Sequence, residues 1–122
     1  MTLVPVVFQR KVVLDRLCMS IALLAVYTCN TCWDTSINDI IKLGSTSPEQ
    51  CYVSLLLLKH ITAMHGTHCH DNKSKHVLGR YIRENLANVQ GYLAQVLQQS
   101  SLPQECHHQA LSASNYWCRF SD

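Results

Sequence analysis

Apolar residues recur at intervals of three and four along most of this chain, and that spacing constrains the fold more than any other feature. One such series runs from Val13 to Ala25 and another from Leu78 to Leu97. Only 4 glycines and 3 prolines interrupt the 122 residues. Because an α-helix repeats about every 3.6 residues, the pattern predicts helices. The scarcity of turn residues argues against a β-sandwich or barrel.

Capping signals and breaks divide the pattern into five expected helices, over residues 8–28, 34–43, 48–64, 76–99 and 103–120. The clearest start is Ser47-Pro48-Glu49-Gln50, with serine as N-cap, proline at the first helical position and glutamine at the third. Asp34 is the expected N-cap of the second helix, and Gly44 its expected C-cap. Residues 66–75 are expected to form a loop.

The order of these helices predicts a repeat architecture. The first and second helices are expected to form one antiparallel pair, the third and fourth another, and the fifth to open a third pair. Paired helices recurring at about 40–50 residues are typical of HEAT-like repeats. The predicted fold is therefore all-α, a solenoid of about two and a half HEAT-like pairs that forms a single fragment over residues 1–122.

A closed five-helix bundle is the alternative arrangement. It requires polar outer faces on its terminal helices, whereas the first expected helix is apolar nearly all round. Such a helix is expected to be covered on more than one side. Composition agrees with a partly covered surface, because 15% of the residues are charged against about 25% in an average soluble domain. The net charge of +2 is too small to predict a nucleic-acid partner.

Four landmarks occur in a familiar order: the segment from Val13 to Ala22, Trp33 with the short helix after it, the leucine-rich third helix with the long fourth, and the segment from Gln109 to Phe120. In this order they resemble the amino-terminal region of nuclear transport receptors of the importin-β superfamily. The nearest branch is the importin-13/transportin-3 group, with its exportin-like domain. One departure is Ile61-Thr-Ala-Met-His-Gly66, where relatives often carry a leucine-proline-acidic-acidic turn.

The resemblance implies a fragment of a receptor that shuttles between nucleus and cytoplasm and binds protein cargo and the GTPase Ran, with no cofactor and no membrane partner. In such receptors the second helix of each pair lines the concave surface. Residues 34–43 and 76–99 would then face partners. The candidate contacts are the charged residues on these helices, although a charged helix face is more often simply solvated: Asp39, Lys42, Arg80, Arg83 and Glu84.

Clusters of cysteine and histidine raise a metal-site hypothesis. Cys29 and Cys32 form one short-spaced pair, and His65, His68, Cys69 and His70 lie together farther along. The separation of the two groups fits none of the common zinc-finger spacings, so no metal site is predicted, and a small zinc-binding module remains an alternative. A redox role for Cys29 and Cys32 would need a βαβ setting, and no strand is expected there.

The sequence predicts no enzyme. Seven cysteines and seven histidines leave any nucleophile–base pairing undefined, and no third, orienting residue stands out. Phosphate-binding glycine loops and a glycine-x-serine-x-glycine elbow are missing as well. Trp33 and Trp117 are interpreted as core residues at helix junctions, with a role as binding hot spots the alternative.

The amino-terminal apolar stretch leaves one more alternative open. Leu17–Cys29 follows Arg10, Lys11 and Arg16, which is the outline of a secretory signal. Asp15 at its edge disfavours that interpretation, and the stretch is shorter than the ~20 residues that span a bilayer. A buried helix with reduced thiols is therefore preferred. A secreted or membrane-associated cysteine-rich protein remains the alternative.

Overall fold

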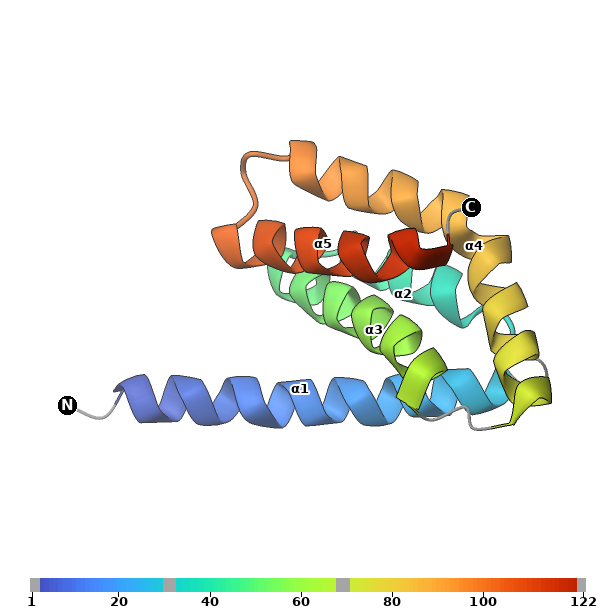
Figure 1. Cartoon of the computed structure of the whole chain (residues 1–122). Helices are drawn as coiled ribbons and strands as arrows, with labels where there is room; N and C mark the ends of the chain where they lie inside the picture. The colour runs from blue at the N-terminus through green and yellow to red at the C-terminus, as the bar shows by residue number, and fades with distance from the viewer. Residues whose placement is uncertain (1–2, 30–32, 68–70, 121–122) are drawn as a thin grey trace.

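The computed structural model describes residues 3–29, 33–67 and 71–120. It contains α1 (Leu3–Thr28), α2 (Ser36–Gly44), α3 (Pro48–Thr67), α4 (Asn72–Gln98) and α5 (Gln104–Trp117), followed by the short 3-10 helix η1 (Cys118–Phe120). Figure 1 shows these elements in chain order. The five expected helices are confirmed, and the described residues include no strand.

The helix bounds differ from the predicted ones mainly at two places. The first helix begins at Leu3 instead of residue 8, because Pro5 falls in its first turn, where a missing N–H costs no hydrogen bond. The expected loop over 66–75 is wrong over much of its length. The third helix continues to Thr67, and α4 already begins at Asn72, since the Asp71 side chain accepts a hydrogen bond from the Ser74 N–H at 3.4 Å.

Local capping was predicted correctly for α3 and wrongly for α2. Ser47 Oγ accepts from the Gln50 N–H at 3.2 Å, as the cap signal predicts. Neither Asp34 nor Thr35 caps α2 through a side chain. Instead the Tyr81 hydroxyl, which comes from α4, accepts from the Ile37 N–H at 3.2 Å. The start of α2 is thus satisfied by tertiary structure.

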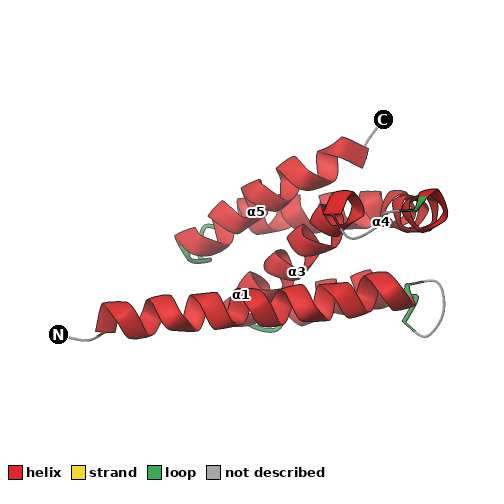
Figure 2. Ribbon diagram, turned by 60° about the horizontal axis from the view of Figure 1, so that its bottom comes forward, coloured by secondary structure: helices red, strands yellow, loops and turns green. Residues whose placement is uncertain are grey.

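The helices form two layers. In one layer α1, α3 and α5 run in the same general direction, with α3 in the middle packed against both neighbours (Figures 1 and 2). In the other layer α2 and α4 run back in the opposite sense (Figure 1). The two outer helices of this layer, α1 and α5, do not pack on one another. This is the open stacking of an all-α helical-repeat solenoid rather than a closed bundle.

Contacts between neighbouring helices are unequal. Those of α3 with α1 and α5, within one layer, are the most extensive, and those of α2 with α3 and of α4 with α5 follow. By contrast, α3 and α4 contact each other less, and α1 hardly contacts α2, so the predicted close packing of the first pair is not present. The grouping of the helices into successive repeats stays a prediction.

The contact between α1 and α3 is made by small side chains. Small residues at spacings of four and three are buried on α1, and Cys29, directly after the helix, continues the series: Cys18, Ala22, Ala25 and Cys29. Small side chains let two helices approach closely. Larger apolar residues of the same predicted series, Leu17, Ile21 and Leu24 among them, are exposed. Cover on more than one side of α1 is absent from the described part of the chain.

Two further contacts fix the layer of α1, α3 and α5. Trp117 is fully buried, and its indole N–H donates to the Leu58 carbonyl at 2.9 Å, so α5 is held against α3. This confirms the core interpretation of Trp117. On the other side of α3, His60 Nε2 lies 2.9 Å from a carboxylate oxygen of Asp15 and joins α3 to α1.

Candidate partner-binding surface

A polar groove follows the seam between α2 and α4. Its larger part has a volume of about 570 Å³ and lies where the end of α1 meets α2 and the first half of α4. The adjoining part, about 420 Å³, shares Asn38 and Asn88 with it. We call this the α2–α4 groove, and its polar lining comes from ten residues: Asp34, Asn38, Lys42, Ser45, His76, Arg80, Glu84, Asn85, Asn88 and Gln95.

Two tyrosines of α4 hold the seam beneath this groove. Tyr81 Oη lies 2.6 Å from Ser36 Oγ, in addition to its bond with the start of α2. Tyr92 Oη lies 2.5 Å from Ser54 Oγ on α3. Both tyrosines are buried, so these hydrogen bonds satisfy hydroxyls that would otherwise be costly to bury. Tyr81 therefore joins α4 to the start of α2, and Tyr92 joins α4 to α3 beneath the groove.

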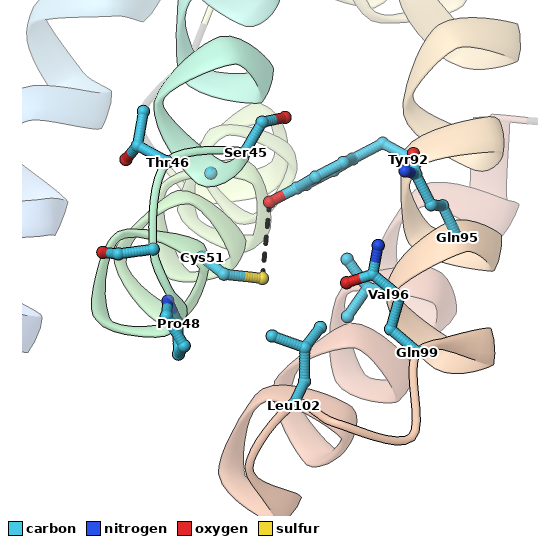
Figure 3. Close-up of a pocket in the computed structure, with 11 residues that line it drawn as sticks. Ser45, Thr46, Pro48, Cys51, Tyr92, Gln95, Val96, Gln99 and Leu102 are labelled. Atoms are coloured by element: carbon cyan, nitrogen blue, oxygen red, sulfur yellow. Dashed lines mark hydrogen bonds between the residues drawn. The ribbon is translucent and has the colours of Figure 1, made fainter.

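The groove continues into a smaller pocket beyond Tyr92. This pocket, about 250 Å³, shares Ser45, Tyr92 and Gln95 with the groove and is closed by the turn between α2 and α3. Figure 3 shows Tyr92 reaching from α4 toward Cys51, with its hydroxyl 3.6 Å from the sulfur. Burial raises the pKa of Tyr92 well above its ordinary value, so its hydroxyl stays protonated and keeps donating.

Gly44 explains why α2 can lie so close to α4. It is buried in the last turn of α2 and does not adopt the left-handed conformation of a glycine C-cap, so its expected role is wrong. A Cβ at this position would overlap the Tyr92 hydroxyl and Ser54 Oγ. Glycine is required here because a hydroxyl occupies the space of its side chain.

Three of the five candidate contact residues lie at the α2–α4 groove. Lys42 lines its α2 side, and Arg80 and Glu84 line its α4 side. Arg80 Nε lies 3.4 Å from Glu84 Oε2, and both side chains are largely exposed. An exposed pair of this kind adds little to stability, about 0–1 kcal/mol, so both side chains are available to other partners.

Asp39 and Arg83 have other surroundings. The Asp39 carboxylate accepts from the Trp33 indole N–H at 2.8 Å and from the Thr35 hydroxyl at 3.1 Å, which fixes the turn before α2. The Arg83 guanidinium lies over the Phe120 ring, 6.0 Å from its centroid, on the side of η1. Neither residue lines the groove.

The amides of the groove were missed by selection on charge alone. Asn38, Asn88 and Gln95 line it, and Asn85 does so while its side chain donates to the Tyr81 carbonyl at 2.9 Å. The spacing along the helix could have identified Asn88 and Gln95, because residues 80, 84, 88 and 95 share one helix face. An amide offers both a donor and an acceptor, as a peptide backbone does. The groove is thus suited to hydrogen-bonding a protein surface.

Two of the buried thiols, Cys18 and Cys106, are poor nucleophiles. Burial raises the pKa of Cys18 to about 11, with the negative charge of Asp15 adding to it. Burial likewise raises the pKa of Cys106 to about 11. A thiol is activated by a lowered pKa, so at neutral pH these two act as small apolar side chains.

The zinc and redox hypotheses fall on Cys32, His68, Cys69 and His70, which lie outside the described residues. Within residues 3–29, 33–67 and 71–120, no three histidine, cysteine or acidic side chains gather into a metal-binding group. His65, the described histidine of that cluster, lies 3.2 Å from the Lys75 carbonyl. Among the described helices, none has the length and apolarity needed to cross a bilayer.

Comparison with known proteins bears on the fold and on this surface. The family model described as exportin 1-like protein matches residues 10–122. Neither the comparison with curated proteins nor that with solved structures found a match. The match covers all five helices except the first turns of α1 and includes the whole α2–α4 groove. The chain therefore belongs to the exportin 1-like family of the importin-β superfamily.

Proposed function

We propose that this chain is a segment of a nucleocytoplasmic transport receptor that contacts Ran GTPase and protein cargo through the α2–α4 groove. The family match supports a transport receptor. The observation that carries the proposal is the convergence of exposed charged and amide side chains from α2 and α4 on one groove. The proposed role is binding without catalysis, in a protein that shuttles between nucleus and cytoplasm. The importin-13/transportin-3 group is the proposed branch.

The outer face of α1 supports the further proposal that the segment belongs to a longer array. Val13, Leu17 and Leu24 each expose more than half of their side-chain surface. A neighbouring helix pair packed on α1, as α1 itself packs on α3, would bury this face. Binding contacts in such an array are spread over successive helix pairs, so this chain alone would hold a small share of them.

The test is a titration of Ran, loaded with a non-hydrolysable GTP analogue, against the 122-residue chain and against the chain extended by family repeats on both sides. We expect weak or undetectable binding by the chain alone and measurable binding by the extended protein. In the extended protein, Arg80→Glu should weaken binding at least tenfold. Arg83→Glu is the matched control, because Arg83 lies on the neighbouring turn and contacts Phe120 instead of the groove.

Circular dichroism of both variants separates binding from folding. If Arg80→Glu and Arg83→Glu weaken binding equally while helicity is retained, the groove is not the contact surface. If neither variant affects Ran or cargo, both partners bind elsewhere on the receptor. Binding by the chain alone as tight as by the extended protein would contradict the distributed-contact argument.

A further inference from the structure

A second concavity lies in the layer of α1, α3 and α5, away from the surface assigned to Ran and cargo. Its volume is about 360 Å³. Pockets that bind small ligands measure roughly 300–1,000 Å³, so this one accepts a few side chains rather than a folded domain. We call it the α1–α3–α5 groove, and its apolar lining consists of Leu14, Pro48, Tyr52, Val53, Pro103 and Cys106.

The floor of this groove is an apolar surface left open by the described helices. Tyr52 and Val53 of α3 and Leu14 of α1 are each only partly buried, although all three pack against the core. Cys106 at the base is fully buried. Partly buried apolar side chains beside a rigid core gain free energy when another apolar side chain covers them.

The rim of the groove is acidic. Glu49 and Glu105 stand in the first turns of α3 and α5 and are exposed. The amino terminus of a helix favours an acidic side chain, so both glutamates stabilise the helices whose first turns they occupy. In the described part of the chain neither glutamate forms an ion pair, and none of the described lining residues is basic.

Negative charge also reaches the groove from α1. Asp15 follows Leu14 in the chain, and its carboxylate faces α3, where it meets His60. Burial raises the pKa of the Tyr52 hydroxyl, and the negative charge of Asp15 raises it further. The charge of Glu105 acts in the same direction. The apolar floor therefore has Glu49 and Glu105 at its rim and Asp15, which is hydrogen-bonded to His60, beside it on α1.

We propose that the α1–α3–α5 groove docks a short apolar segment of a partner protein that carries lysine or arginine on its flanks. Apolar side chains of the segment would cover Leu14, Tyr52 and Val53. Basic flanks would meet Glu49 and Glu105, which are exposed and form no ion pair with the other described residues. Complementary charge of this kind sets specificity and association rate more than total affinity. A segment with acidic flanks would be repelled by the same rim.

The experiment measures peptide binding by fluorescence anisotropy on the 122-residue chain. One labelled probe is a short peptide with a leucine-rich centre and paired lysines at each end. The other has the same centre with glutamates at each end. We expect the wild-type chain to bind the lysine-flanked probe at least tenfold more tightly, with a preference that shrinks as salt rises. Equal affinity for both probes, or binding of neither, would overturn the proposal.

Rim variants locate the site. Glu49→Lys with Glu105→Lys should reverse the preference, and Glu49→Gln with Glu105→Gln should abolish it. The glutamine variant keeps the test valid if lysine at a helix amino terminus weakens the fold. Glu84→Lys is the matched control, since it changes an exposed glutamate in the α2–α4 groove. It should leave both affinities unchanged.

Two outcomes would assign the surface otherwise. If Glu84→Lys alters peptide binding as much as the rim variants do, the probe senses net charge and the groove has no special role. If sedimentation shows a dimer that the rim variants dissociate, the groove is an interface between two copies of this chain. Failure here leaves the Ran and cargo proposal intact, because that proposal depends on the other groove.

Discussion

The two longest helices, α1 and α4, expose opposite kinds of side chain to solvent. On α1 the exposed surface carries large apolar side chains, including Leu17, Ile21 and Leu24, while small residues face the core. On α4 the buried face carries leucine, valine and tyrosine, and amides and charges are directed outward. Hydrophobic burial places large apolar groups inside and polar groups outside. By that criterion the apolar face of α4 is largely covered. The apolar face of α1 has no packing partner among the described residues.

The difference also concerns how each helix is attached. The small side chains of α1 pack toward α3, and one hydrogen bond from the His60 ring to the Asp15 carboxylate adds to this contact. The seam of α4 with α2 depends on the hydrogen bonds of the Tyr81 hydroxyl and on the close approach at Gly44. Apolar contact of this kind tolerates small shifts, whereas buried hydrogen bonds require a defined geometry.

The largest expected effect breaks the α4 seam. Gly44→Ala places a methyl group where Tyr92 and Ser54 meet, and overpacking of this kind costs about 3 kcal/mol of unfolding free energy. Gly91→Ala is the matched control, because nothing lies near its Cβ position and alanine favours a helix by about 1 kcal/mol. Urea denaturation of both variants measures the difference. A Gly44→Ala protein as stable as wild type would contradict the packing at this seam.

A smaller effect is expected from the exposed face of α1. We predict that the isolated chain self-associates through this face and that Leu17→Glu with Leu24→Glu prevents it. Each leucine is about half exposed, so covering it gains about 1 kcal/mol, and losing both weakens association about thirtyfold. Sedimentation velocity over a range of concentrations measures this.

Leu111→Glu provides the control for self-association. Leu111 on α5 is 52% exposed, similar to the 55% and 56% of the two α1 leucines. If this variant reduces association equally, the effect is a general one of surface charge. A wild-type chain that stays monomeric at high concentration would remove the distinction between α1 and α4.

The hydrogen bonds of Tyr81 give the next smaller effect. Tyr81→Phe keeps the ring but leaves Ser36 Oγ and the Ile37 N–H without their partner at the start of α2. Loss of a buried partner costs about 1–2 kcal/mol. Hydrogen exchange should show the increase in opening at α2 rather than at α1, which α2 hardly contacts. If exchange increases equally throughout the chain, the Tyr81 hydroxyl does not stabilise α2 in particular.

The smallest effect is a dependence of stability on alkaline pH at the α1–α3 contact. Burial raises the pKa of Cys18 from 9.0 to about 11, so folding favours the neutral thiol. Its contribution is fully present below pH 9 and is lost as pH rises toward 11, by on the order of 1 kcal/mol. Cys18→Ala should reduce the slope of unfolding free energy against pH in that range. An unchanged slope would assign it to other groups, such as Cys106 or the tyrosines.

The helices and part of their ends follow from local sequence. Spacing of apolar residues is a local property, and so is the cap at Ser47, where the interacting atoms lie within a few residues of each other. The polar face of α4 could be predicted for the same reason, and Arg80 and Glu84 were found because they are charged. Asn88 and Gln95 could have been found from their spacing on that face.

Which helix faces meet depends on contacts between residues far apart in the chain. Both the large and the small apolar residues of α1 satisfy a helical pattern, and the close approach of α3 selects Cys18, Ala22 and Ala25 for burial. The Tyr81 cap of α2 joins residues 44 positions apart, and the clash that requires Gly44 involves Tyr92 on another helix. Pairing between helices depends on shape complementarity over such distances, and local periodicity carries no information about it.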